Sequence, residues 1–412
     1  MDGGQSTRIL IYSHDSFGLG HLRRCRAIAH ALVERNKHMS ALILSGSPII
    51  GSFDFRARVD FVRIPGVIKL RNGEYTSLSQ LVDTQQTLAM RESIIRHTAD
   101  IYDPHLMLVD KEPLGLRGEV KPTLEMLAER GCKLVLGLRD IMDDPRMLAT
   151  EWKRKHVVPA LERLFDEIWV YGMPQICDPL AGVAVSAAVR EKTHFTGYLR
   201  RELPTGLSDE YYSDDGNRPP YVLVTTGGGG DGDEVIDWAI GAYEAQPELV
   251  PKAVFVLGPF MQPELRAGFQ ERIGRLPGLE VITFDARIEA LIDGAVGIVG
   301  MGGYNTFCEV LSFDKPAVLV PRTRPRMEQF IRAERAQRLG LVRMLAAEQA
   351  GDPALMADAI RALPQQSRPS AVMIPGLLDG LDSLNGRLHA ILGLAEDEDE
   401  RAAAGAIRRV GG

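Results

Sequence analysis

The sequence predicts an α/β protein built from two Rossmann-like domains that face each other across a cleft. At 412 residues, the chain exceeds what one hydrophobic core usually supports, so two domains are expected. Short apolar runs alternate with helical segments, which indicates right-handed β-α-β units and parallel sheets. Each half also opens with a strand, a glycine-bearing turn and a helix, which is the layout of a Rossmann-like domain.

The first domain is expected to span residues 1–198. RILIYS at residues 8–13 reads as a short buried strand, and a glycine-bearing turn leads from it into a helix from Gly20 to Arg35. The apolar runs that follow predict further strands separated by helices or loops. These strands are expected at residues 41–46, 105–110, 132–138 and 167–172.

The second domain is expected at residues 221–395, after a polar, proline-bearing linker at residues 199–220. It repeats the pattern with the strand YVLVTT, the loop GGGGDG and a helical segment. Its strands are expected at residues 221–226, 252–258, 279–284, 297–300 and 316–321. The tail at residues 396–412 is charged and rich in small residues, a composition that predicts disorder.

The composition is that of an ordinary globular protein, with 45% apolar and 25% charged residues. The net charge of −7 argues against general nucleic-acid binding, which requires basic stripes. The N-terminus lacks the apolar core of a signal peptide, and no apolar stretch approaches the roughly 20 residues that a membrane helix needs. The cysteines form no CxxC pair, which favours a reducing cytoplasm over a disulfide framework or a zinc site.

The turn after the first strand is the first candidate for chemistry. Gly18 and Gly20 permit a tight turn there, so the helix N-terminus lies at the sheet edge where open α/β folds bind ligands. His21 then projects from the first turn of the helix toward the cleft, where a neutral imidazole is able to take a proton from an acceptor hydroxyl. The competing interpretation is that His21 only caps or packs at the helix start.

Asp110 ends the strand HLMLVD, and a carboxylate at that position lies at the same ligand edge. It is placed to orient His21 and to stabilise its charged form, which is the base-plus-orienter arrangement of hydrolase triads without their protein nucleophile. The alternative is a loop aspartate or a helix cap. Arg23 and Arg24 lie on the acceptor side, or form a solvated face together with Arg26.

The glycine loop at the start of the second domain is the next candidate. Consecutive glycines between a strand and a helix let the backbone approach a pyrophosphate and offer N–H donors in a nest. The run is neither a P-loop nor a clean GxGxxG, and a steric role is the competing explanation. The donor-binding candidates in it are Gly227, Gly228, Gly229 and Gly230.

A second glycine turn follows the strand at residues 297–300. Gly302 and Gly303 precede a helix that begins near Asn305, so the free amides of that helix form a second anion site. Glu309 lies about one turn into the helix, where its carboxylate is able to bridge both hydroxyls of a ribose. The alternative is an ordinary acid on the helix surface.

A basic loop and a polar pair follow the strand PAVLVP. The loop carries Arg322, Arg324 and Arg326, and Glu328 and Gln329 come next. The latter two are able to hydrogen-bond sugar hydroxyls, whereas the arginines belong either to the anion site or to a solvated loop. Together these candidates fit a sugar that is linked through a diphosphate to a nucleoside. The two glycine turns offer amides to the diphosphate, Glu309 is able to bind the ribose hydroxyls, and Glu328 and Gln329 are able to bind the sugar hydroxyls.

No metal site or cofactor is predicted. The chain has no DxD motif where a metal would be needed. The adjacent acids Asp143-Asp144 and Asp214-Asp215 are expected in solvated turns rather than as metal ligands.

Residues 301–329 resemble the nucleotide-sugar signature of inverting glycosyltransferases of the two-Rossmann, B-type fold. MGGYNTFCE is similar to the HCGWNSTLE core of UDP-glycosyltransferases, and the EQ pair resembles the acid–glutamine pair that ends their signature. The region also resembles the N-acetylglucosamine transferases that act on lipid-linked muropeptide. The resemblance implies a diphosphate near Gly303, Asn305 and Thr306, a ribose on Glu309, and the donor sugar on Glu328 and Gln329.

The N-terminal half resembles the same enzymes more loosely. GLGH at residues 18–21 is similar to their glycine–histidine turn, whose histidine is the general base, and LVD at 108–110 to the strand whose aspartate supports it. The whole chain looks most like an uncharacterised bacterial branch of predicted glycosyltransferases. One departure is Met301, which replaces a histidine or arginine on the β-phosphate, so the charge there is expected from backbone amides or from Arg322, Arg324 or Arg326.

The sequence therefore predicts an inverting, metal-independent glycosyltransferase, hexosyl or N-acetylhexosaminyl, that uses a UDP-linked sugar. The acceptor is a small molecule, a polysaccharide or a lipid-linked molecule, which a peripheral enzyme is able to meet at a membrane surface. GLGHLRRCRAIAHAL also resembles the UDP-sugar hydrolases of pseudaminic acid synthesis, which are shorter chains. A nucleotide-sugar hydrolase or 2-epimerase of the same fold is therefore the alternative, and a non-catalytic nucleotide-sugar binding protein is another.

Overall fold

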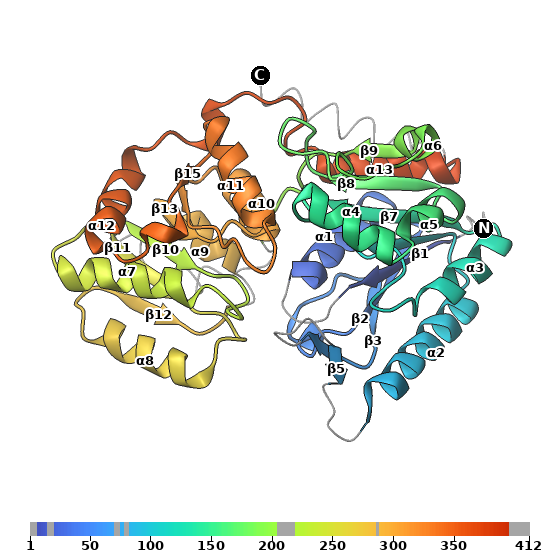
Figure 1. Cartoon of the computed structure of the whole chain (residues 1–412), viewed down its shortest axis with the longest axis horizontal. Helices are drawn as coiled ribbons and strands as arrows, with labels where there is room; N and C mark the ends of the chain where they lie inside the picture. The colour runs from blue at the N-terminus through green and yellow to red at the C-terminus, as the bar shows by residue number, and fades with distance from the viewer. Residues whose placement is uncertain are drawn as a thin grey trace.

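The computed structural model describes residues 6–14, 20–69, 75–77, 82–203, 219–285 and 288–394. These residues form two lobes, each built around a twisted parallel sheet with helices against it (Figure 1). The predicted two-domain α/β architecture is confirmed. Gly18, Asp214, Asp215, most of the expected linker and the 396–412 tail lie outside the described residues.

The first sheet has the strand order β3-β2-β1-β6-β7-β8-β9, and all its pairings are parallel. The strands are β1 Thr7–Ser13, β2 Met39–Ser45, β3 Val59–Arg63, β6 Leu106–Asp110, β7 Lys133–Arg139, β8 Glu167–Tyr171 and β9 Thr193–Phe195. A separate antiparallel pair consists of β4 Val67–Lys69 and β5 Tyr75–Ser77.

The second sheet has the order β12-β11-β10-β13-β14-β15 and is also parallel. Its strands are β10 Tyr221–Thr225, β11 Lys252–Val256, β12 Glu280–Ile282, β13 Gly297–Gly300, β14 Ala317–Leu319 and β15 Arg343–Met344. In both sheets the order reverses beside the first strand of the lobe, which is where such folds form their ligand crevice.

Helices connect the strands in both lobes. In the first half they are α1 Gly20–Arg35, α2 Thr84–Tyr102, α3 Lys121–Glu129, α4 Pro145–Arg154, α5 Val157–Arg163 and α6 Ala187–Glu191. In the second half they are α7 Asp233–Ala245, α8 Pro263–Gly274, α9 Ile288–Gly294, α10 Tyr304–Ser312, α11 Glu328–Arg338, α12 Pro353–Ala362 and α13 Gly380–Leu392. Short 3-10 turns occur at Ile50–Ser52, Ala347–Gln349, Leu363–Gln365 and Pro369–Ala371. None of the described helices is long and apolar enough to cross a membrane.

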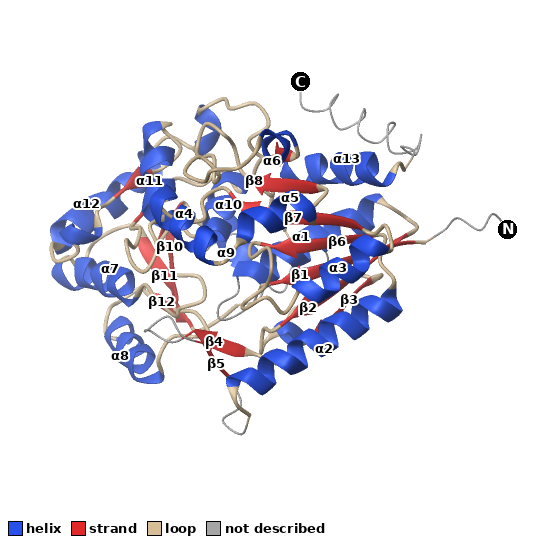
Figure 2. Ribbon diagram, turned by 45° about the vertical axis from the view of Figure 1, so that its right-hand side comes forward, coloured by secondary structure: helices blue, strands red, loops and turns tan. Residues whose placement is uncertain are grey.

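Strand β1 has consecutive apolar residues from Ile9 to Ile11 because both faces of its sheet are covered. Successive side chains of a strand point to opposite faces, and a parallel sheet covered on both faces buries both sets. Ile9 and Ile11 pack in the core that contains α1, whereas Leu10 and Tyr12 pack in the core that contains α2 and α3. Figure 2 shows α2 and α3 in front of this sheet.

Two chain segments cross between the lobes and pair with each other. The backbone N–H of Tyr198 donates to the carbonyl of Leu377, and Leu199 forms a bridge with Asp379. The approach is close enough that a Cβ on Gly197 would lie 2.3 Å from the carbonyl oxygen of Gly376. The second crossing returns the chain to the first lobe.

The return of the chain places α13 against the first lobe, which differs from the expectation that residues 221–395 form the second domain. Asn36 at the end of α1 hydrogen-bonds both Asn385 and His389 of α13. Arg387 of α13 also binds Glu167 of β8. Figure 1 shows the red α13 beside β8 and β9. The sequence of residues 221–395 does not predict this return. The α13 segment has an ordinary amphipathic pattern, which indicates a helix with one buried face but not the lobe against which that face packs.

Candidate active site

A cavity of about 190 Å³ lies between the lobes, where the C-terminal edges of the two sheets face each other. We call it the interdomain cleft, and its lining includes His21, Arg139, Gly227, Gly303, Glu328 and Gln329. The first lobe contributes the start of α1 and the end of β7. The second lobe contributes the glycine loop, the start of α10 and the start of α11. The two predicted site regions therefore meet in one cavity.

His21 and Asp110 come together as the sequence predicts. Val109 of β6 is the register partner of Tyr12 of β1, so Asp110 and the C-terminal end of β1 lie at the same sheet edge. The Nδ1 atom of His21 lies 2.5 Å from Oδ2 of Asp110. The NH2 atom of Arg24 also lies 3.0 Å from Nδ1, but it donates to Asp110 over a shorter distance of 2.7 Å. A carboxylate only accepts hydrogen bonds, so we assign the proton to Nδ1 and the free lone pair to Nε2.

The protonation states of His21 and Asp110 are those that a general base and its supporting carboxylate need. Burial lowers the pKa of His21 to about 4, and the nearby Asp110 carboxylate offsets only part of that effect. Burial alone would raise the pKa of Asp110, but the Arg24 and His21 contacts hold it well below its usual range. At neutral pH the imidazole is therefore uncharged and the carboxylate is ionised.

Arg24 forms the other half of the Asp110 site. Its Nε and NH2 atoms lie 2.8 Å and 2.7 Å from the two carboxylate oxygens of Asp110, and its side chain is only 2% exposed. Its guanidinium also lies 5.3 Å from the ring centre of Tyr304. The solvated face considered for this residue is therefore wrong, because a buried guanidinium requires the carboxylate partner that Asp110 provides.

The start of α10 forms the opposite wall of the interdomain cleft. Gly303 is the N-terminal cap of this helix, and Asn305 and Thr306 line the cleft beside it. The free N–H groups and the dipole of a helix N-terminus favour an anion there. The Asn305 side chain also donates to the carbonyl of Gly20, 3.2 Å away in the other lobe, and accepts from Arg201. Gly302 lies just outside the lining, where its carbonyl accepts from Arg332.

The glycine loop divides into two parts. Gly227 and Gly228 line the interdomain cleft, whereas Gly229 is buried and Gly230 is exposed outside it. Gly229 has a φ of +75°, and a Cβ there would lie 2.3 Å from the carbonyl oxygen of Leu257. The small size of Gly229 is therefore required for packing, and among these four glycines only Gly227 and Gly228 line the interdomain cleft.

Met301 packs beneath this loop. Its side chain is 6% exposed, and a Cβ on Gly232 would lie 2.3 Å from the Met301 sulfur. The methionine therefore belongs to the second-lobe core and not to the surface of the interdomain cleft.

The predicted sugar-reading pair lines the interdomain cleft at the start of α11. Arg322 fixes both members, because its NH2 atom lies 2.7 Å from Oε1 of Glu328 and its backbone N–H donates to Gln329 over 3.2 Å. The second carboxylate oxygen of Glu328, Oε2, is buried and accepts no hydrogen bond from any residue that the structure describes. This oxygen remains available to a hydroxyl donor.

Glu309 occupies a different environment from the expected ribose site. It is 2% exposed, lies outside the lining of the interdomain cleft, and its Oε1 atom is 2.7 Å from NH2 of Arg23. Arg23 also binds Glu289 of α9 over 2.6 Å, so this arginine joins α1 to two helices of the other lobe. Burial raises the pKa of Glu309, and Arg23 counteracts that rise. The surface acid considered as the alternative is excluded.

The other arginines of the 322–326 loop do not line the interdomain cleft. Arg324 is exposed. Arg326 reaches across to the first lobe, where it binds Glu151 over 3.0 Å and lies 3.4 Å from Asp143. Asp143 also accepts from the backbone of Met327, so it is an interlobe contact and not a solvated turn.

Two features of the site were not predicted. Arg139 ends β7 and lines the interdomain cleft, and its buried Nε atom has no hydrogen-bond partner in the part of the chain that the structure describes. Asp140, the next residue, forms a fully buried pair with Arg332 of α11 through two contacts of 2.7 Å. The sequence does place Arg139 and Asp140 at the end of a predicted parallel strand. That position could have identified them, because the C-terminal edge of the sheet bounds the ligand crevice.

Comparison with known proteins identifies the fold. Residues 257–373 match the glycosyltransferase family 28 C-terminal domain. No curated protein matches the sequence significantly. The chain is similar in structure to CalG4, the calicheamicin glycosyltransferase, with 16% identity, 95% of this chain and 100% of that chain covered, and a TM-score of 0.58.

Two further solved structures are similar over their whole length. UGT2 of Phytolacca americana, complexed with UDP-2-fluoro-glucose and pterostilbene, has 15% identity, coverage of 98% and 99%, and a TM-score of 0.58. MurG of Acinetobacter baumannii has 11% identity, coverage of 98% and 99%, and a TM-score of 0.51. The resemblance drawn from residues 301–329 is confirmed: the chain has the B-type glycosyltransferase fold, and residues 257–373, which include this segment, match the family 28 C-terminal domain.

Proposed function

We propose, from the B-type glycosyltransferase fold and the family 28 C-terminal domain, that this chain transfers a sugar from a nucleotide-diphosphate sugar to an acceptor hydroxyl. The observation that carries the proposal is the buried His21–Asp110 pair facing the N-terminus of α10 across the interdomain cleft. A base and an anion site on opposite walls are what a direct displacement at an anomeric carbon requires.

In this mechanism Nε2 of His21 takes the proton of the acceptor hydroxyl as the oxygen attacks the anomeric carbon. The bond from that carbon to the diphosphate breaks on the opposite face, so configuration inverts. Asp110 steadies the imidazolium that forms, and Arg24 keeps the carboxylate ionised and in place.

The departing diphosphate is stabilised by the amides at Gly227, Gly228 and Gly303 and by Arg139. Four arginines line the interdomain cleft, and within the described residues Arg139 is the one without a carboxylate partner. Burial lowers the pKa of Arg139 to about 10, so it remains charged at neutral pH. It thus supplies the cation that Met301 cannot, and the mechanism needs no metal ion.

The donor sugar lies against Glu328 and Gln329, with Oε2 of Glu328 accepting from a sugar hydroxyl. The ribose lies toward Glu309, which requires Arg23 to release that carboxylate when the donor binds. UDP is the nucleotide we propose, because the Phytolacca structure contains a UDP-sugar.

The test is turnover of a panel of nucleotide sugars with and without hydroxyl acceptors, each in the presence and absence of excess EDTA. We expect UDP release that depends on acceptor and is unchanged by EDTA, with an anomeric product inverted relative to the donor. Release of free sugar at one rate with or without acceptor would support the hydrolase alternative. Tight UDP binding without any turnover would support a binding protein.

A further inference from the structure

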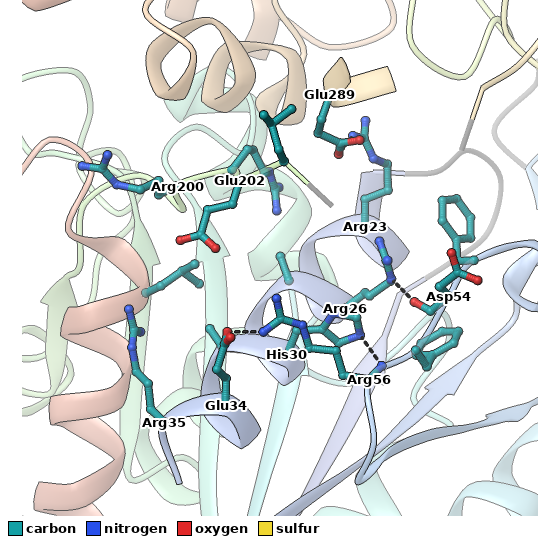
Figure 3. Close-up of a pocket in the computed structure, with 17 residues that line it drawn as sticks. Arg23, Arg26, His30, Glu34, Arg35, Asp54, Arg56, Arg200, Glu202 and Glu289 are labelled. Carbon is teal, nitrogen blue, oxygen red and sulfur yellow. Dashed lines mark hydrogen bonds and ion pairs between the residues drawn. The ribbon is translucent and has the colours of Figure 1, made fainter. Parts of the chain in front are cut away.

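A second cavity, about 630 Å³ in volume, runs along one face of α1 (Figure 3). We call it the α1 groove and define it by Arg23, Arg26, His30, Phe53, Arg200 and Arg201. The helix residues among these are three and four positions apart, so they share one face of α1. Arg23 and Phe53 also line the interdomain cleft, so the two cavities adjoin.

The lining of the α1 groove is rich in guanidinium groups. It contains six arginines against four carboxylates. Three of the arginines have carboxylate partners: Arg23 binds Glu289, Arg35 binds Asp382 and Arg56 binds Glu34. Two of the lining carboxylates, Asp54 and Glu202, are exposed.

The other three arginines form no ion pair with any described residue. Arg26 donates from Nε to the backbone carbonyl of Asp54 over 2.7 Å, and its guanidinium lies 5.6 Å from the ring centre of Phe53 (Figure 3). These contacts orient the side chain but give it no carboxylate within ion-pair distance, and the Glu289 and Asp54 carboxylates act on its charge only from farther away. Burial accordingly lowers the pKa of Arg26.

Arg201 is 8% exposed and donates to the neutral amide oxygen of Asn305 over 2.9 Å. Its Nε atom is buried and has no hydrogen-bond partner among the described residues. Buried donors are rarely left unpaired, and buried charges are usually paired, so these groups point to an anionic ligand. Arg200 is exposed on the opposite side of the α1 groove from Arg26, and it adds a further charge that forms no ion pair with a described residue (Figure 3).

We propose that the α1 groove binds the phosphate group of a sugar-phosphate acceptor, an assignment that rests on the proposed transfer reaction. Guanidinium groups match phosphate oxygens in geometry and charge. Arg26 lies five positions after His21, a rise of about 7.5 Å along the helix axis. A phosphate bound there therefore lies within one or two sugar units of a hydroxyl held at His21.

The test is calorimetric titration of the full chain, saturated with UDP so that the donor site is filled. Inorganic phosphate and glucose 1-phosphate serve as probes. We expect glucose 1-phosphate to bind about tenfold more tightly than inorganic phosphate, and Arg26→Gln and Arg200→Gln each to weaken both by about tenfold through the loss of charged hydrogen bonds. Arg96→Gln, which removes an exposed charge on α2, is the matched control and leaves both affinities unchanged.

Equal affinity for the two probes, lost in Arg26→Gln, would make the ligand a free anion and overturn the acceptor assignment. Binding that Arg26→Gln and Arg200→Gln leave unchanged, or no binding at all, would overturn the α1 groove as a site. If UDP itself fails to bind, the proposed transfer reaction is contradicted, and the same comparison of variants then decides the α1 groove alone.

Discussion

The Nδ1 atom of His21 and the Oδ2 atom of Asp110 are 2.5 Å apart, although 89 positions separate them in the chain. The contact fixes the imidazole tautomer and leaves Nε2 for the substrate. The kinetic consequence is specific. His21→Ala should lower kcat by about 10²–10⁴-fold, the range for loss of a general base, while UDP affinity stays unchanged because none of the proposed contacts to the nucleotide involves His21. Steady-state kinetics and UDP titration measure the two effects.

His97→Ala is the control for that substitution, since His97 is exposed on α2. It should behave as the wild type. A fully active His21→Ala enzyme would leave His21 as a packing residue at the helix start.

The pH profile should lack the step expected of an ordinary histidine. Burial lowers the pKa of His21 to about 4, so the neutral, basic form is present above that pH and is lost only as the pH falls through it. We expect kcat/KM to stay level between pH 8 and 5 as far as His21 is concerned, whereas an unperturbed imidazole would be half protonated near pH 6.5. A half-loss of kcat/KM near pH 6.5 that disappears in His21→Ala would contradict the buried, neutral state.

Asp110→Asn should destabilise the fold as well as slow turnover. It leaves the buried Arg24 guanidinium without its carboxylate, and breaking a buried pair typically costs about 3–5 kcal/mol. Urea unfolding of Asp110→Asn, Arg24→Met and the double variant checks this. The double variant should be more stable than the sum of the two losses, because it leaves no uncompensated charge. Strict additivity would mean that the two side chains act independently.

Arg139→Ala should weaken UDP binding by about 1.5–3 kcal/mol, the usual contribution of a hydrogen bond to a charged group. Uridine affinity should not change, because uridine has no phosphate for Arg139 to bind. Arg139→Lys keeps the charge and should recover part of the loss. Titration of each variant with both ligands tests the assignment, and equal effects on UDP and uridine would place Arg139 away from the diphosphate.

Glu309→Gln should reduce the ability of the site to recognise ribose. If the carboxylate binds the ribose hydroxyls, the wild type prefers UDP to 2′-deoxy-UDP by about 1–3 kcal/mol, and the substitution removes most of that preference. Calorimetric titration with both nucleotides measures it. An unchanged preference would show that Glu309 serves only as the partner of Arg23.

Part of this protein follows from the sequence alone. Runs such as RILIYS and YVLVTT, each followed by glycines and a helix, determine the two parallel sheets, because strand and helix periodicities are local properties. His21 and Asp110 were predictable as a pair, since both lie just beyond parallel strands whose C-terminal ends share an edge. Glu328 and Gln329 were recognised through the motif around residues 301–329.

Only the tertiary structure decided how the charges are distributed. Arg24 and Arg26 are two positions apart in one arginine-rich run, yet Arg24 is buried on Asp110 and Arg26 faces the α1 groove unpaired. Glu309 binds Arg23 in the other lobe, and α13 returns to pack near α1. The physical reason is that a charged side chain takes whichever partner the packed lobes bring within reach, and that partner is set by the placement of distant segments rather than by any local periodicity.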